Sequence, residues 1–172
     1  MIASIDPVRT KSVALLSLPR DLYFLHTDHA MKTEKGKLNA LWRDNAILHM
    51  QQEGMETEDA GDLSLKELSA EIGAALGVPI HHAVKVDFEA FVEVVDAIGG
   101  IDVNVPETIH DTEYPDGNYG YETFHIEAGM RHMDGETALK YARTRSTTSD
   151  FDRSERQQQI LRAAAEKAKA SG

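Results

Sequence analysis

The sequence of 172 residues contains no cysteine. Disulfide bonds, thiolate metal sites and a cysteine nucleophile are therefore excluded. The longest apolar runs fall far short of the roughly 18–20 residues that span a bilayer. The first residues, MIASIDP, lack the basic and then apolar pattern of a signal peptide. They are typical of a strand entered midway, which predicts that the chain begins inside a domain.

Basic residues are also scarce. The chain has 18 Lys and Arg against 29 Asp and Glu, and its net charge is −11 at pH 7. Proteins that bind DNA or RNA need basic stripes that displace counterions, so we expect no nucleic-acid partner. The apolar fraction of 41% predicts one globular domain over residues 1–172.

Hydrophobic periodicity predicts alternating strands and helices. Strands are expected at residues 1–5, 12–18, 79–86, 101–105 and 123–126, the first two forming a hairpin and the second being a buried central strand. Helices are expected at residues 37–50, 64–76, 88–98, 134–144 and from 154 onward. Asp134 is expected to cap its helix, and Gly77 to end the helix at 64–76. Ser64 and Ser154 are candidate caps, and a lid or a hairpin is expected at residues 108–121.

Polar residues follow the expected central strand. Arg20 and Asp21 come directly after its end, where ligands gather in open α/β sheets. The alternative is a surface ion pair that closes a turn. Further on, His26, Asp28 and His29 are either a metal site or an ordinary solvated loop.

Five of the 18 basic residues lie between Lys140 and Arg156. Arg143 and Arg145 end one expected helix, while Arg153 and Gln157 begin the next on its inward face. All of these can converge on one phosphate-bearing ligand, because arginine matches phosphate oxygens bidentately and helix N-termini favour anions. The alternative is pairing with the local acids Asp150, Asp152 and Glu155. Arg156 and Lys140 are expected to be bystanders.

Five motifs match one known family in its order and spacing, over nearly the whole chain. They are SLPRD at 17–21, KLNA at 37–40, VDFEAFVEVVDAIGGIDVNVP at 86–106, MDGETALKYARTR at 133–145 and DFDRSERQQQIL at 150–161. Together they resemble the LytR-CpsA-Psr family. The resemblance implies an α/β fold with a central mixed β-sheet sandwiched between helices, and an apolar groove for a lipid tail.

The resemblance also implies an activity. These proteins transfer a glycopolymer from a polyprenyl-pyrophosphate carrier to a peptidoglycan sugar hydroxyl, at the extracytoplasmic face of the cell membrane. The family's pyrophosphate contacts match a set of basic and polar side chains: Arg20, Lys37, Arg143, Arg145, Arg153 and Gln157. Asp21 matches the acid of a Mg²⁺ site, and catalysis is expected from Arg20, Asp21, Arg143 and Arg145.

The chain departs from the family pattern in several places. A Ser-Asp-Thr/Ser segment, whose aspartate is a metal ligand and candidate base, would precede Met1, as would the first strand and a membrane anchor. We expect that the sequence is truncated at its N-terminus. The alternative is that the protein is inactive. Leu41 and Trp42 replace the usual residues after KLNA, so Trp42 either lines the lipid groove or belongs to the core. Two other functions stay open: a non-catalytic polyprenyl-phosphate binding module and a lipid pyrophosphatase.

Overall fold

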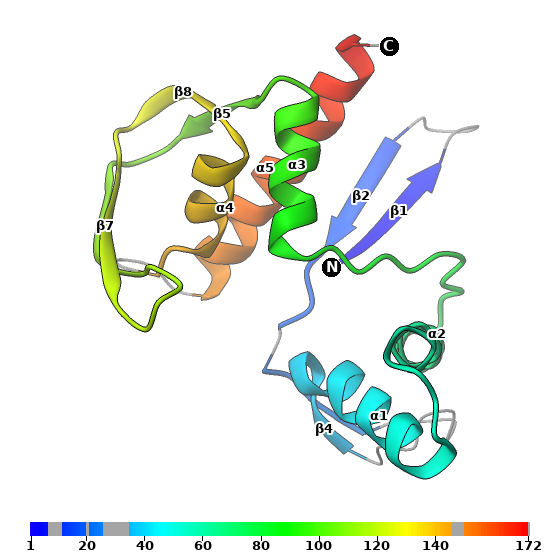
Figure 1. Cartoon of the computed structure of the whole chain (residues 1–172). Helices are drawn as coiled ribbons and strands as arrows, with labels where there is room; N and C mark the ends of the chain where they lie inside the picture. The colour runs from blue at the N-terminus through cyan, green and yellow to red at the C-terminus, as the bar shows by residue number, and fades with distance from the viewer. Residues whose placement is uncertain (7–11, 20, 26–34, 146–149, 172) are drawn as a thin grey trace. The chain divides into compact units, whose positions relative to one another are not determined.

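The structure is a computed structural model, and it describes residues 1–6, 12–19, 21–25, 35–145 and 150–171. The chain divides into two compact units, Met1–Lys85 and Val86–Gly172, which are described separately below (Figure 1). The single domain expected over residues 1–172 stays a prediction.

Unit 1 begins with two short hairpins. β1 (Ile2–Asp6) pairs antiparallel with β2 (Ser12–Leu16), as the sequence predicts. β3 (Tyr23–Leu25) pairs antiparallel with β4 (Lys35–Lys37). The expectation that residues 12–18 form a buried central strand is wrong for the described residues, because β2 pairs only with β1 there and Leu16 is 51% exposed.

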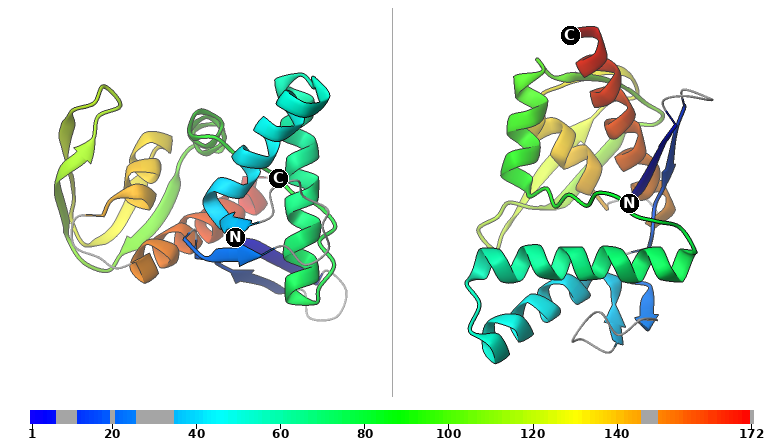
Figure 2. Two further views of the ribbon diagram at one scale, coloured as in Figure 1. Left: turned by 90° about the horizontal axis from the view of Figure 1, so that it is seen from below. Right: turned by 90° about the vertical axis from the view of Figure 1, so that its right-hand side faces the viewer.

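Two helices complete unit 1, and they pack against each other (Figure 2). α1 (Leu38–Glu53) ends at Gly54 and α2 (Thr57–Leu76) ends at Gly77. Both glycines adopt a left-handed conformation, with φ of 67° and 66°, which few other residues accept at a helix end.

Contacts between these helices correct two predictions from the sequence. Ser64 does not cap a helix: α2 begins seven residues earlier, and the buried Ser64 hydroxyl donates to the carbonyl of Trp42 at 2.6 Å. The indole of Trp42 donates to the carbonyl of Gly61 at 2.9 Å, so Trp42 belongs to the α1–α2 contact. Residues 79–86, expected to be a strand, form neither a strand nor a helix.

Unit 2 contains three helices and four strands. The helices are α3 (Phe88–Ala97), α4 (Gly135–Arg143) and α5 (Asp150–Ser171). The strands are β5 (Ile101–Val105), β6 (Ile109–Pro115), β7 (Tyr121–Ile126) and β8 (Gly129–Met133). β5 pairs with β8 and β6 with β7, both antiparallel. The excursion at 108–121 is therefore largely a hairpin, one of its two expected forms.

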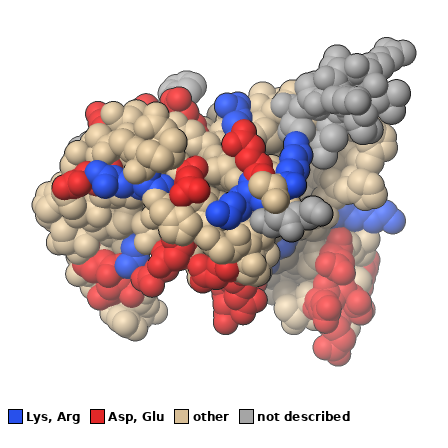
Figure 3. All heavy atoms as spheres, turned by 90° about the horizontal axis from the view of Figure 1, so that it is seen from above, with Lys and Arg blue, Asp and Glu red and all other residues tan. Residues whose placement is uncertain are grey.

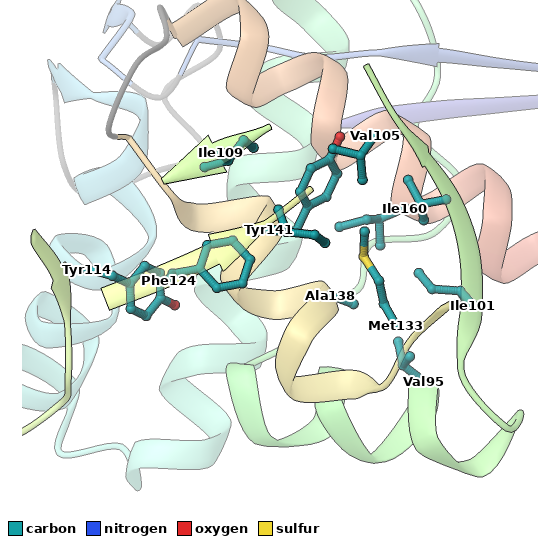
Figure 4. Close-up of a cluster of buried hydrophobic side chains, with 12 residues drawn as sticks. Val95, Ile101, Val105, Ile109, Tyr114, Phe124, Met133, Ala138, Tyr141 and Ile160 are labelled. Carbon is teal, nitrogen blue, oxygen red and sulfur yellow. The ribbon is translucent and has the colours of Figure 1, made fainter. Parts of the chain in front are cut away.

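The core of unit 2 lies where these ladders meet the helices. Inward residues alternate along β5, where Ile101, Val103 and Val105 are buried. They pack with Tyr141 of α4 and Ile160 of α5 (Figure 4). Figure 1 shows α4 within the curve of the strands, and it contacts both α3 and α5.

The α/β class predicted from the sequence is confirmed. The described strands form four two-stranded antiparallel sheets, so a single mixed sheet is not among the pairings described. One boundary is wrong: α5 begins at Asp150, which excludes Ser154 as its cap.

Candidate functional site

The candidate site in unit 2 is built around the C-terminal end of α4. The helix starts where the Asp134 carboxylate accepts a hydrogen bond of 2.8 Å from the backbone N–H of Thr137, as the sequence predicts. It ends at Arg143, because Thr144 takes an extended conformation with ψ of 144°. Arg143 therefore lies on the last turn, and Arg145 lies just beyond it.

Arg143 is held by two aromatic residues. Its guanidinium carbon lies 4.1 Å from the ring centroid of Phe88 on α3, and its Nη1 donates to the Tyr114 hydroxyl at 3.2 Å. Burial raises the pKa of Tyr114, and the neighbouring Arg143 and Lys140 charges oppose that rise. Cation–π contact and the hydrogen bond together fix the direction of the guanidinium.

Arg145 is held through its backbone, and its side chain is exposed. Its N–H donates to Oδ2 of Asp111 at 3.3 Å, and the Thr144 hydroxyl donates to the same oxygen at 2.5 Å. Asp111 is buried on β6, next to the exposed His110. The exposed guanidinium of Arg145 can contact an anion.

Arg156 is not the bystander that the sequence predicts. It is only 5% exposed, and it donates to the carbonyl oxygens of Tyr141 at 3.1 Å and Thr144 at 2.7 Å. Burial lowers its pKa. Its hydrogen bonds satisfy carbonyls that the end of α4 leaves without helical partners. Arg156 therefore joins α5 to the chain segment that carries Arg143 and Arg145.

Arg153 and Gln157 lie on the opening turns of α5, and both are half-buried. Arg153 precedes Arg156 by three residues, so it shares that face of the helix, one turn closer to the N-terminus. The structure thus brings Arg143, Arg145 and Arg156 to one junction and places Arg153 on the adjoining turn. Lys140 lies apart, because it pairs with Glu122 and Glu136 at 2.9 and 2.8 Å.

Asp111, Tyr114 and Phe88 support the site but were not predicted from the sequence as site residues. Strand alternation could have identified Asp111, since Ile109 and Asp111 point to the same buried face. Arg156 could have been found by stepping back one turn from the buried Ile160. Stepping back from Leu161, which is 44% exposed, selects Gln157 instead.

Unit 1 carries the other predicted residues. Lys37 Nζ lies 3.4 Å from Asp21 Oδ1, and both side chains are exposed. Arg20 and the His26, Asp28 and His29 cluster lie outside the described residues. A meeting of Asp21 and Lys37 with the arginines of unit 2 at one pyrophosphate stays a prediction.

Acidic side chains lie beside Arg156. A pocket of about 60 Å³ beside Arg156 is lined by Glu107, Asp152 and Glu155 among others. On the face drawn in Figure 3, Lys and Arg are interspersed with Asp and Glu. A ligand would therefore meet a few oriented guanidinium groups rather than a broad basic field.

The described residues offer a metal few ligands. They contain no group of three or more His, Asp or Glu side chains suited to a metal ion. The single exposed carboxylate of Asp21 fits a Mg²⁺ ion bound mainly by substrate phosphates and water, and it does not fit a cage made of protein ligands.

No helix within the described ranges has both the length and the apolar character needed to cross a membrane. The chain is 31% identical over 165 residues to polyisoprenyl-teichoic acid–peptidoglycan teichoic acid transferase TagV of Bacillus subtilis (strain 168). The match covers 95% of this chain but 36% of TagV.

Solved structures show the same relationship. The crystal structure of B. subtilis TagV aligns with a TM-score of 0.67 at 30% identity, covering 96% of this chain and 54% of that one. The LytR-CPS2A-psr family protein YwtF (TagT), solved with bound octaprenyl pyrophosphate lipid, aligns with a TM-score of 0.54 at 25% identity. The alignment covers 89% of this chain and 52% of that one. The chain therefore spans about a third to a half of these relatives.

The model of one protein family matches residues 1–172, the whole sequence. The chain belongs to the LytR_cpsA_psr family.

Proposed function

We propose that this chain is part of a phosphotransferase that moves a glycopolymer from a polyprenyl-pyrophosphate carrier to a peptidoglycan sugar hydroxyl. The observation that carries the proposal is the junction of α4 and α5. There Arg143 is fixed between aromatic rings and Arg145 projects from a backbone anchored on Asp111. Related transferases act on polyisoprenyl-linked teichoic acid and peptidoglycan, as their names state, which supports the same substrate class.

The proposed chemistry is transfer at phosphorus. The acceptor hydroxyl oxygen bonds to the phosphorus that carries the glycopolymer, the bond to the bridging oxygen breaks, and polyprenyl phosphate leaves. The hydroxyl proton passes to a base. Negative charge grows on the leaving phosphate, and fixed guanidinium groups stabilise it without having to reorganise.

Each predicted residue has a role in this proposal. Arg143, Arg145 and Arg153 hold the pyrophosphate, with Gln157 as a neighbouring polar contact, while Arg20 and Lys37 add positive charge from unit 1. Asp21 would hold Mg²⁺, which would supply positive charge to neutralise the phosphates. Reaction takes place at the extracytoplasmic membrane surface, where the lipid carrier lies. A central mixed sheet between helices is part of the same proposal.

Substitution of the arginines tests the proposal in the full-length protein. Lipid-linked glycopolymer and peptidoglycan are supplied, and phosphodiester-linked product is measured. We expect Arg143→Ala and Arg145→Ala to abolish transfer while the fold is retained. The control is Arg162→Ala. Arg162 lies on the same helix as Arg153, and its hydrogen bond to Gln158 is long, at 3.5 Å, and exposed. Near-normal transfer by both site variants would overturn the assignment.

The same assay separates the other two functions. Phosphate release without an acceptor would indicate a lipid pyrophosphatase, and carrier binding without any reaction would indicate a binding module. Transfer should cease in EDTA and return with added Mg²⁺. Transfer that persists in EDTA would contradict the metal requirement while leaving the arginine assignment in place.

A further inference from the structure

Two histidines face each other across the β6–β7 hairpin. His110 on β6 and His125 on β7 are direct partners in the antiparallel ladder. Both are exposed, on the side of the hairpin opposite the buried Ile109, Asp111 and Phe124. Their rings meet edge to face, with centroids 5.5 Å apart and planes at 69°.

This separation suits two imidazoles that share one ion. With metal–nitrogen bonds of about 2.0–2.1 Å and a tetrahedral angle, the two ring centroids would lie about 5 Å apart. Directly opposed residues of an antiparallel pair have Cβ atoms about 4.5–5.5 Å apart, so the backbone holds the rings at this distance.

We propose that His110 and His125 form a chelating site for one divalent transition-metal ion, such as Zn²⁺ or Ni²⁺. Imidazole nitrogen is a preferred ligand of these ions, whereas Mg²⁺ prefers oxygen. The remaining coordination positions are filled by water, since the described residues hold no group of three or more metal-binding side chains. The site is independent of the proposed phosphotransferase function and separate from its Mg²⁺.

The ion would connect the two strands of the hairpin that supports the arginines. Asp111 follows His110 directly and points to the other face, where it holds Thr144 and Arg145. Tyr114, four residues further along β6 than His110, accepts a hydrogen bond from Arg143, and its ring lies near that guanidinium. A bound ion stabilises the folded hairpin by mass action, because the unfolded chain does not hold the two rings together.

Metal titration of tag-free protein tests the proposal. Calorimetry with ZnCl₂ and NiCl₂ should give one ion per chain, and MgCl₂ should give no binding at this site. His110→Asn and His125→Asn should each weaken Zn²⁺ binding by at least about tenfold. The double variant should be no weaker than either single variant, because removal of one ligand already breaks the chelate.

His132→Asn is the matched control. His132 is also exposed, on β8, and its Nδ1 lies 2.9 Å from Oδ1 of Asp102. Its substitution should leave Zn²⁺ affinity unchanged. The proposal would be overturned if the losses of Zn²⁺ affinity in His110→Asn and His125→Asn added up in the double variant. It would also be overturned if His132→Asn lowered Zn²⁺ affinity while the other two variants did not, or if the wild-type protein bound no Zn²⁺. Melting temperatures without metal show that each variant is folded, and glutamine variants replace any that is not.

Discussion

The carboxylate of Asp111 accepts a hydrogen bond of 2.5 Å from the hydroxyl of Thr144. This bond joins β6 to the residue that separates Arg143 from Arg145. Asp111 is 4% exposed, so water does not replace its partners. The position of the two proposed phosphate-binding arginines therefore depends on a carboxylate that itself faces away from solvent.

Asp111→Ala should lower the free energy of unfolding by about 1–3 kcal/mol, because it leaves the Thr144 hydroxyl and the Arg145 N–H unsatisfied. Urea unfolding followed by circular dichroism measures the change. Glu113→Ala removes an exposed acid of the same strand and should change stability by no more than about 0.5 kcal/mol. Equal losses in the two variants would show that the buried bonds contribute nothing.

Substitutions at Arg156 and Arg145 should have opposite effects, one mainly on the free energy of unfolding and the other mainly on transfer. Arg156→Ala removes two charge-assisted hydrogen bonds to the end of α4, so stability should fall by about 1.5–3 kcal/mol. Arg145→Ala removes an exposed side chain and should cost no more than about 0.5 kcal/mol while abolishing transfer. Urea unfolding and the transfer assay are run on the same preparations. A stable Arg156→Ala protein would contradict the structural role of that guanidinium.

His49 makes the stability of unit 1 depend on pH. It lies on α1, with Nδ1 3.0 Å from Oε2 of Glu53 on the same helix and Nε2 2.8 Å from Oε2 of Glu67 on α2. Burial alone lowers the pKa of His49, but the hydrogen bonds and charges of Glu67 and Glu53 outweigh it, so the pKa is raised. Both ring nitrogens face carboxylate oxygens, and both can donate only when the imidazole is protonated.

The sign of the effect follows from the raised pKa. The stabilisation is complete below about pH 6.5, the ordinary pKa of histidine in an unfolded chain, and it is lost as pH rises through the pKa of the folded state. Unfolding of α1 and α2, measured in urea at a series of pH values, should become easier across that interval. His49→Gln should remove most of this dependence, and His132→Gln should not. A free energy of unfolding of the wild-type protein that rises with pH across that interval would show that His49 is not protonated in the folded state.

Gly99 and Gly100 form a matched pair between α3 and β5. Both have positive φ, 78° and 76°, so alanine is strained at either position by about 1–2 kcal/mol. A Cβ on Gly99 would meet nothing within 4 Å, whereas one on Gly100 would lie 2.8 Å from the Met133 carbonyl oxygen. Thermal unfolding should therefore show Gly100→Ala to be less stable than Gly99→Ala by about a further 1–3 kcal/mol. Equal melting temperatures would mean that β8 moves to accept the methyl group.

Features that depend on neighbours in the sequence were predictable. Asp134 caps α4 because the carboxylate reaches an N–H only three residues away, and Gly77 ends α2 because a residue without Cβ accepts a positive φ. Alternation of apolar residues likewise predicted β5. The five family motifs placed the chain in its family.

Features that depend on distant residues were decided only by tertiary structure. Ser64 carries a cap signal, but its hydroxyl is used across the α1–α2 contact, where no N-terminus exists. The sequence predicts that Arg156 is a bystander. It is buried because the carbonyls of Tyr141 and Thr144 come within reach only when α5 packs on α4. The sequence by itself thus determined the cap at Asp134, the helix end at Gly77, the alternation of β5 and which residues carry charge. Which of those charges are buried as supports and which remain open to a ligand was decided by packing, because burial is a property of the whole fold.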